Sequence, residues 1–483
     1  MVLGKWLTRA IGIVSMVVLA RLIEPEAFGL IALATICIGF FEMLQAIGIE
    51  RYLIIQTKLS DELMNSSWTL QILTRFSVCT LLLISADFIA DFFNEPQLAL
   101  IIHVLAVNNV FAAFNNIGLS HYHRELDFQK LTYLQLISKL LSTLITLTVA
   151  YIYPSYWALL AGSMSTLWIY LVGSYVVCDY RPKLNFHFER KMFSFSGVIL
   201  CRNFLSYCRS KADALLVSRL FDATALGMYK VGADFAQLPL TEVIYPAGQA
   251  ILPGMAKFKQ DRAELYQKMY KYLALIYAFI LPCIVGIWFV AEQFCIVILG
   301  EKWADTAPIM ASLAVTMVSY PMNGIATNLF DCLGKEKYSI FSDVFGLTCI
   351  ALMVLSLPLE TVFSFSVWRG YIGVAVFVFV LLLLKYSINF SLKGAMMALL
   401  PSSIASFAMY FAFTTLYYNT SITFWGLVAN ILFGALSYAM ALLLLVIILR
   451  QHSVIWQFWY QKGWDMLQRI LVKITNSRSL GGI

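Results

Sequence analysis

The sequence predicts an all-α polytopic membrane protein with about 14 transmembrane helices, arranged as two six-helix lobes related by a pseudo-two-fold axis plus two C-terminal helices. Apolar stretches recur that are each long enough to cross a hydrocarbon layer of ~30 Å, which takes about 20 helical residues. The composition is 60% hydrophobic and only 13% charged, which would leave a water-soluble globule too little polar surface. Lys and Arg are concentrated in every second connection, as topology requires.

The first six apolar stretches are expected to form the N-terminal lobe, residues 1–192. The opening stretch contains Arg9, reaches Arg21 and lacks a small-x-small cleavage site, which indicates a retained helix rather than a signal peptide. Residues 28–47 and 70–89 are further runs of bilayer length. Because no connection exceeds about 15 to 20 residues, there is no room for a folded soluble domain.

Six more stretches are expected to form the C-terminal lobe, residues 193–393. Two additional helices follow in residues 394–450, before a cytoplasmic tail, residues 451–483. The last two apolar runs, residues 395–416 and 424–449, carry no charged group. We therefore expect them to form a peripheral pair or a lipid-facing groove rather than part of a substrate path.

The distribution of cations predicts the orientation. By the positive-inside rule, the connections rich in Lys and Arg and both termini lie in the cytoplasm. The alternate connections are acidic or nearly uncharged, as in residues 87–95 and 151–156. The net charge of +7 is thus explained by topology, and no nucleic-acid partner is expected. The connecting cations are Arg51, Lys58, Arg124, Lys130, Arg181, Lys183, Arg190, Lys191, Lys257, Lys259, Arg262, Lys268, Lys271, Lys335, Lys337, Lys385 and Lys393.

An internal repeat relates the two lobes. The segment LARLIEPEAFGL, residues 19–30, aligns with VSRLFDATALGM, residues 217–228, so that Arg21 meets Arg219 at an offset of 198 residues. A shorter match pairs HVLAV with ASLAV at an offset of 208 residues. Two halves with the same orientation imply a pseudo-two-fold axis along the membrane normal and a cavity between the lobes, which is a transporter architecture.

Charged residues within the predicted helices are the candidate site. A charge near the bilayer centre costs at least ~2.5–3.5 kcal/mol, so such residues usually line an aqueous cavity or pair with each other. Since cations outnumber acids here and occur in both lobes, an anionic substrate is expected, above all a phosphate or pyrophosphate, which arginine binds in a bidentate manner. The candidate substrate-binding residues are Arg9, Arg75, Lys139, Arg202 and Arg209.

The seventh predicted helix is the richest in charge. Arg202, Arg209 and Asp213 recur at intervals of seven and four residues, which places them on one helical face. On the eighth, Asp234 heads a polar stripe with Gln237 and Thr241, and Glu242 lies nearby.

The alternative for each of these charges is a structural pair. Asp213 would pair with Arg209 along one helix, and Glu42 with Arg75 across two helices. The fourth predicted helix adds polar side chains to which no role is assigned: Asn108, Asn109, Asn115 and Asn116.

No metal or cofactor is expected. The nine cysteines are scattered singly, without paired metal-ligand spacing. His121 and His123 are two residues apart and would not share a helix face. Short loops also argue against an enzyme, which would need a polar region to carry catalytic groups.

Several motifs resemble one family. KWLTR, VSMVVLARLIEPEAFGLIALA, FNNIGLSHYHRELDFQKL and YPSYWALLAG are followed in the second half by DALLVSRLFDATALGMYKVGADFAQLPLTEVIYPAGQAILPG and ILGEKWADTAPIMASLA. From about Trp6 to about Leu313 the chain is similar to the polysaccharide transporter family, of the O-antigen, capsule and colanic-acid type, within the multidrug/oligosaccharidyl-lipid/polysaccharide exporter superfamily.

The resemblance implies a flippase of the bacterial inner membrane. Its substrate would be an oligosaccharide on undecaprenyl pyrophosphate, moved to the outer leaflet by alternating access for surface polysaccharide synthesis, with polymerase or assembly proteins as further partners. Drive by an ion gradient or membrane potential would make Asp213, Asp234 and Glu242 the coupling carboxylates. The chain starts about ten to twenty residues later than such relatives, and HYHRELDF replaces a more basic run usual there.

Three other functions are alternatives. A multidrug or cation antiporter of the same superfamily would favour an acidic cavity, whereas this one is basic. A membrane polysaccharide polymerase would present a sizeable polar loop, and none is here. A peptidoglycan-precursor flippase would share the cationic cavity, but the motifs favour the polysaccharide branch.

Overall fold

The computed structural model describes residues 2–44, 53, 60–125, 127–188, 197–248, 261–416, 421–449 and 461. Within these residues all regular secondary structure is helical and no strand occurs, which confirms the predicted fold class. The chain divides into two compact units. Unit 1 comprises Met1–Val231 and Ile298–Trp303, and unit 2 comprises Gly232–Val297 and Ala304–Ile483.

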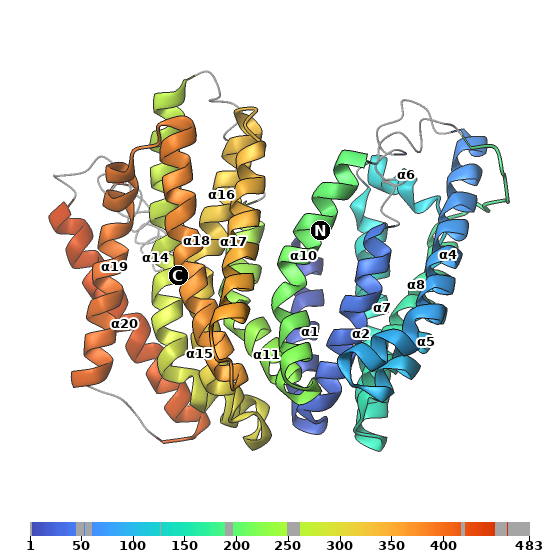
Figure 1. Ribbon diagram of the computed structural model, residues 1–483, viewed down its shortest axis with the longest axis horizontal. Coiled ribbons are helices and arrows are strands. Elements are labelled where there is room, and N and C mark those ends of the chain that lie inside the picture. Colours follow the sequence, from blue (N-terminus) through green and yellow to red (C-terminus); the bar gives the residue numbers. More distant parts are fainter. Residues whose placement is uncertain are drawn as a thin grey trace, which may run out of the picture. The chain divides into compact units, whose positions relative to one another are not determined.

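Unit 1 is a bundle of helices whose two most extensive contacts join neighbours in the sequence. Its helices are α1 (Val2–Leu22), α2 (Pro25–Leu44), α4 (Asp61–Phe93), α5 (Pro96–Ala113), α6 (Leu119–Arg124), α7 (Phe128–Ile152), α8 (Tyr156–Val177), α10 (Gly197–Leu220) and the first part of α11 (Ala223–Ala236). As Figure 1 shows, α4 pairs with α5 and α7 with α8. Helix α2 contacts α4, α5, α8 and α10, so side chains from four helices can reach it.

Unit 2 contains the rest of α11 and the later helices. These are η1 (Leu240–Ile244), α12 (Tyr245–Gly248), α14 (Arg262–Phe294), η2 (Cys295–Leu299, whose last two residues belong to unit 1), α15 (Thr306–Ala314), η4 (Val315–Val318), α16 (Ser319–Cys332), α17 (Lys337–Ser356), α18 (Val362–Ile388), α19 (Leu392–Thr415) and α20 (Phe424–Leu449). Helix α14 packs against α15, α19 and α20, and α18 packs against α15, α16 and α17.

Local sequence signals explain where several helices begin and end. Ser60 caps α4 by accepting a hydrogen bond from the N–H of Leu63 at 3.2 Å. The same helix ends at Asn94, which adopts the left-handed conformation at φ 56° that asparagine tolerates better than most residues. Pro96 then opens α5, at the position where a missing N–H costs nothing.

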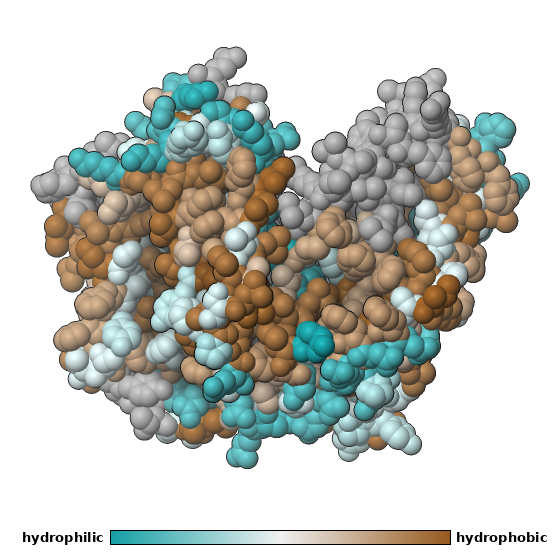
Figure 2. Space-filling view, in the orientation of Figure 1, coloured by the Kyte–Doolittle hydropathy of each residue, from teal (hydrophilic) through white to brown (hydrophobic). Residues whose placement is uncertain are grey.

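Eleven of the described helical segments are long and apolar enough to cross a membrane, by length and composition. Helices α1 and α10, of 21 and 24 residues, are not among these eleven. Figure 2 shows mainly hydrophobic residues over α17 and α18. Leu355 of α17 and Leu382 of α18 are both exposed. A polytopic membrane protein is thereby confirmed, while the count of about 14 spans and the lobe boundary at residues 192 and 193 stay predictions.

The helix that carries Asp234 and Glu242 is not continuous. Helix α11 is followed by a turn at Gln237, and Leu240–Ile244 form the π-helix η1. Pro239 lies at the junction and has no N–H to donate to the helical ladder, which is a usual cause of such breaks. The N–H of Thr241 still donates to the carbonyl oxygen of Gln237 at 3.0 Å, so Thr241 remains one helical turn after Gln237, as the predicted polar stripe requires.

The two copies of the internal repeat lie against each other within unit 1. A Cβ added at Gly29 would overlap the carbonyl oxygen of Ala223, and one added at Gly227 would overlap that of Pro25. Pro25 and Ala223 are themselves equivalent in the repeat. The contact is thus reciprocal, as a local two-fold relation between the segments produces, and only glycine lets the backbones approach so closely.

A short segment between α14 and α15 returns to unit 1. This segment, Ile298–Trp303, is called the strap below and includes the turn η3 (Glu301–Trp303). Trp303 is fully buried; its Nε1 donates to the carbonyl oxygen of Ala20 at 2.7 Å, and its ring meets Phe28 edge-on. The strap is therefore anchored at the connection between α1 and α2.

Candidate anion-binding site

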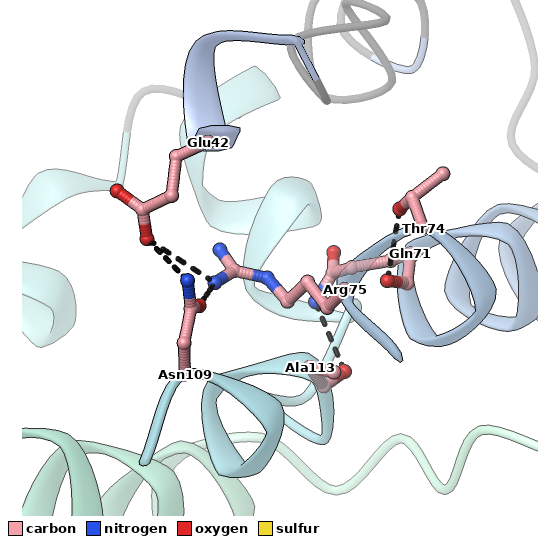
Figure 3. Close-up of polar contacts among 6 residues, drawn as sticks. All are labelled: Glu42, Gln71, Thr74, Arg75, Asn109 and Ala113. Atoms are coloured by element: carbon pink, nitrogen blue, oxygen red, sulfur yellow. Dashed lines mark hydrogen bonds and ion pairs between the residues drawn. The ribbon is translucent and has the colours of Figure 1, made fainter. Parts of the chain in front are cut away.

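Three polar side chains from three helices of unit 1 form a cluster, shown in Figure 3. Arg75 of α4 lies 3.9 Å, Nη1 to Oε1, from Glu42 of α2. Asn109 of α5 lies beside both: its Nδ2 donates to Glu42 Oε1 at 2.7 Å, and its Oδ1 accepts from Arg75 Nη1. We refer to this cluster as the Arg75 site.

Packing between α4 and α5 fixes the position of the cluster. Gln71, one helical turn before Arg75, donates through Nε2 to the carbonyl oxygen of Ala113 at 3.1 Å. Ala113 lies one turn after Asn109, so this bond ties the two helices next to the site, as Figure 3 shows. Asn109 is only 6% exposed, and a buried amide is stable only when it is hydrogen-bonded. The two hydrogen bonds of Asn109 therefore fix the positions of the Glu42 and Arg75 side chains relative to each other.

The charges of the site balance but are not sealed from solvent. The side chain of Arg75 is 28% exposed and that of Glu42 is 46% exposed. Guanidinium carries five N–H donors in a planar fork. Among the residues that the structure describes, both contacts of Arg75 in this cluster use Nη1. An incoming anion can thus approach the guanidinium and compete with Glu42 for it.

Two other predicted cations share a different helix pair. Arg9 is exposed on α1, and Lys139 is half-buried on α7. These helices pack together, and Lys139 Cε lies 3.8 Å from the place that a Cβ at Gly12 would occupy. The structure thus brings the helices of Arg9 and Lys139 together, separately from the Arg75 site.

The charges predicted for the seventh helix lie on α10. Arg209 and Asp213 are half-buried, and the unbroken α10 keeps them on one face as their spacing predicts. Arg202 lies on the same helix, but its side chain is outside the described residues. Helix α10 packs against α2, which is the helix that carries Glu42.

The two remaining candidates belong to unit 2. Asp234 is half-buried on α11, and Glu242 is half-buried in η1. The Oε1 of Glu242 accepts a hydrogen bond from Thr241 Oγ1 at 3.1 Å. Their assignment as coupling carboxylates is not tested by these contacts and stays a prediction.

Sequence reasoning missed the bridging role of Asn109. For Glu42 and Arg75, the alternative to a substrate-binding role is a structural ion pair, and the structure shows this pair. The available signal for Asn109 was a pair of adjacent asparagines, Asn108 and Asn109, in the mainly apolar α5, and both are buried. Buried amide groups need hydrogen-bond partners, and charged side chains on neighbouring membrane helices can provide them.

Comparison with known proteins identifies relatives. The sequence model of a family described as "Polysaccharide biosynthesis protein" matches residues 18–308. The chain is 24% identical over 309 residues to the lipopolysaccharide biosynthesis protein WzxC of Escherichia coli (strain K12), covering 63% of each chain. It is 23% identical to the succinoglycan biosynthesis transport protein ExoT of Rhizobium meliloti (strain 1021), covering 65% of this chain and 64% of ExoT. The matches thus span just under two thirds of these relatives.

Solved structures share the fold. The lipid II flippase MurJ, in an inward closed conformation, superposes with a TM-score of 0.68 at 16% identity, covering 93% of this chain and 98% of that one. An inward-facing multidrug resistance transporter of the MATE family superposes with a TM-score of 0.50 at 14% identity, covering 83% of this chain and 95% of that one. At such identities the likeness concerns the fold alone.

Proposed function

The chain belongs to the family of polysaccharide biosynthesis proteins, and on that premise we propose that it is a flippase for a lipid-linked oligosaccharide. The substrate is an oligosaccharide on undecaprenyl pyrophosphate, and the protein moves it from the inner to the outer leaflet of the bacterial inner membrane. Alternating access carries the headgroup across while the lipid tail stays in the bilayer. The product serves the synthesis of surface polysaccharide.

The Arg75 site is the observation that carries this proposal. It holds a half-buried guanidinium on a membrane-length helix, with a single carboxylate as its described ionic partner. Arginine binds phosphate oxygens through paired N–H donors, so a pyrophosphate is the matching chemistry. In this proposal Arg75 binds the pyrophosphate, and Arg9, Lys139, Arg202 and Arg209 are further cations along the path.

The remaining features follow from the same proposal. The protein acts as a transporter and not as an enzyme, with both termini in the cytoplasm. Asp213, Asp234 and Glu242 couple transport to an ion gradient. Membrane lipid surrounds the helices, and a polysaccharide polymerase receives the product in the outer leaflet. The relatives named above support this class, since they are described as polysaccharide biosynthesis or transport proteins.

Deletion of the gene in its own host tests the function. Surface polysaccharide and lipid-linked oligosaccharide in the inner membrane are measured together. We expect the first to be lost and the second to accumulate on the cytoplasmic leaflet. Unchanged polysaccharide with altered drug sensitivity would assign the protein to the multidrug branch instead.

Substitution of Arg75 in a complemented deletion strain tests the site. Arg75→Ala removes a charge-assisted contact of ~1.5–3 kcal/mol, which corresponds to a loss of export of roughly 10- to 100-fold. Arg75→Lys keeps the charge without the fork, so partial export is expected. Asp87→Asn, at an exposed position on the same helix, is the control. Full export by Arg75→Ala at normal protein level would exclude Arg75 from substrate binding, and Arg202→Ala and Arg209→Ala are assayed in the same way.

A further inference from the structure

Within the Arg75 site, we infer that Glu42 takes up a proton when an anion binds to Arg75, and that Asn109 is the positioning residue that makes this exchange possible. The inference rests on the proposed function, because it concerns the same guanidinium. It assigns a role to a carboxylate that so far figures only as the ionic partner of Arg75.

Charge balance requires the exchange. In the structure the Arg75 guanidinium and the Glu42 carboxylate compensate each other at 3.9 Å. A pyrophosphate that binds Arg75 brings at least one further negative charge to the same place. Two anions close together disfavour each other's ionised form, most strongly in a partly desolvated site. Glu42 responds by accepting a proton from hydronium or a buffer acid in the adjoining water: the carboxyl O–H bond forms as the donor's bond to that proton breaks, and the donor's conjugate base stays in solution.

The geometry of Asn109 fits both states of Glu42. Its amide has a donor side and an acceptor side, and the structure uses both: Nδ2 donates to Glu42 and Oδ1 accepts from Arg75. A neutral carboxyl group still offers a carbonyl oxygen, so the hydrogen bond from Nδ2 persists after protonation. The nearly buried Asn109 therefore stays in place while the charge of its neighbour changes.

The groups around Glu42 leave Arg75 as the controlling charge. Helix α5 contributes the neutral Asn109, and α8 carries no Asp, Glu, Lys, Arg or His. Helix α10 contributes Tyr207, whose hydroxyl donates to the carbonyl oxygen of Ile36. The other charged groups that the packed helices carry are His103 on α5, Arg202, Arg209, Lys211, Asp213 and Arg219 on α10, and Asp61, Glu62, Asp87 and Asp91 on α4. Among the described residues, the ion pair of Glu42 is with Arg75.

Thermodynamic linkage gives the direction of the pH effect. If anion binding promotes protonation of Glu42, then protonation must promote anion binding by the same factor. The affinity for the anion therefore falls as the pH rises through the range in which Glu42 titrates. The limit for one linked proton is about tenfold in affinity per pH unit.

The test uses the full-length protein in nanodiscs, titrated calorimetrically with inorganic pyrophosphate. Buffers of different ionisation enthalpy report the number of protons taken up per anion bound. Because pyrophosphate titrates by itself, the informative quantity is the difference between the wild type and Glu42→Gln. We expect the wild type to take up more protons, by up to one, and to lose affinity with rising pH more steeply than Glu42→Gln. Glu42→Asp, which keeps the carboxyl group, should retain the uptake, and Asp87→Asn should match the wild type.

A double variant tests the positioning role of Asn109. Without the amide that lies beside both side chains, Arg75 and Glu42 can approach more closely than 3.9 Å and compete more strongly with the anion. Asn109→Leu should therefore weaken binding roughly tenfold near neutral pH, and Glu42→Gln/Asn109→Leu should recover it. A merely structural asparagine would show no such recovery.

Each outcome is decisive. Pyrophosphate binding with the same proton uptake in the wild type and Glu42→Gln overturns the inference but leaves Arg75 as the anion site. Absence of pyrophosphate binding in the wild type overturns the Arg75 site itself, and the inference with it. Should Glu42→Gln fail to fold, Glu42→Ala provides the same comparison.

Discussion

Glu95 shows how surroundings set the state of a carboxylate at the scale of single residues. It lies between α4 and α5, and its Oε1 accepts a hydrogen bond from the N–H of Ala223 at 3.0 Å, at the start of α11. Burial raises the pKa of Glu95, and the nearby Glu26 and Asp222 raise this pKa further, whereas the bond from Ala223 opposes them. Folding therefore disfavours the ionised form of Glu95.

Stability should respond to pH through this residue. With its pKa raised by folding, the Glu95 carboxyl group binds protons more tightly in the folded than in the unfolded protein, so its contribution to stability falls as the pH rises from the usual value to the raised one. Glu95→Gln keeps an oxygen for the N–H of Ala223 and removes the charge. We expect its thermal unfolding temperature to exceed that of the wild type near neutral pH and to match it in acid, as measured by scanning fluorimetry in detergent. A difference that does not vary with pH would contradict this.

At the level of single residues, the sequence identifies which charged side chains are costly to bury in the membrane, but it does not predict which residues they contact. Arg75 could be identified because a lone cation in an apolar helix is expensive. That Glu42 and Asn109 meet it depends on how α2, α4 and α5 are rotated about their axes, which tertiary packing decides. The rotation of α4 against α5 is fixed by contacts such as Gln71 to Ala113, 42 residues apart.

At the scale of elements, the crossing at Gly29 and Gly227 is a close backbone approach between the repeat segments. Gly29→Ala places a methyl group on the carbonyl of Ala223, and Gly227→Ala places one on that of Pro25. Overpacking of this kind typically costs ~1–3 kcal/mol. We expect both variants to unfold at lower temperature and to accumulate less.

Another helical glycine provides the control for that prediction. A Cβ at Gly324 of α16 would meet no atom within 4 Å. Because alanine is favoured over glycine in a helix by about 1 kcal/mol, Gly324→Ala should be neutral or stabilising. Equal effects at all three positions would show that the close approach of the repeats has no energetic weight.

Element prediction succeeded where the signal is local and failed where it is not. Long apolar runs and caps such as Ser60 predict helices without any knowledge of neighbours. The break at Gln237 is harder, because prolines are tolerated in membrane helices when other groups satisfy the backbone. The strap has no periodic hydrophobic pattern, so its contact with the α1–α2 connection could not be predicted from the sequence.

At the scale of the whole molecule, the strap belongs to unit 1 while the residues on both sides of it, Val297 and Ala304, belong to unit 2. Besides the buried Trp303, it is held by Arg21, whose Nε donates to the carbonyl oxygen of Ile298 at 2.9 Å. In the proposed alternating-access mechanism, unit 2 moves against unit 1. Because the chain is continuous, such a movement must either release the strap from its contacts with α1 and α2 or bend the chain where the strap joins Val297 and Ala304.

A covalent link tests which of these occurs. Lys302 Nζ lies 3.3 Å from Glu24 Oε1, so Glu24→Cys and Lys302→Cys can be joined by a short, reducible bifunctional thiol reagent in a protein cleared of its nine native cysteines. If the strap is released in each cycle, the link should stop export and a reductant should restore it. A link between Asn65→Cys and Lys183→Cys is the control. In the structure the backbone N–H of Lys183 donates to Asn65 within unit 1, so this link should leave export unchanged. Export that continues at the wild-type rate with the strap linked would mean that its two ends bend while its contacts with α1 and α2 persist.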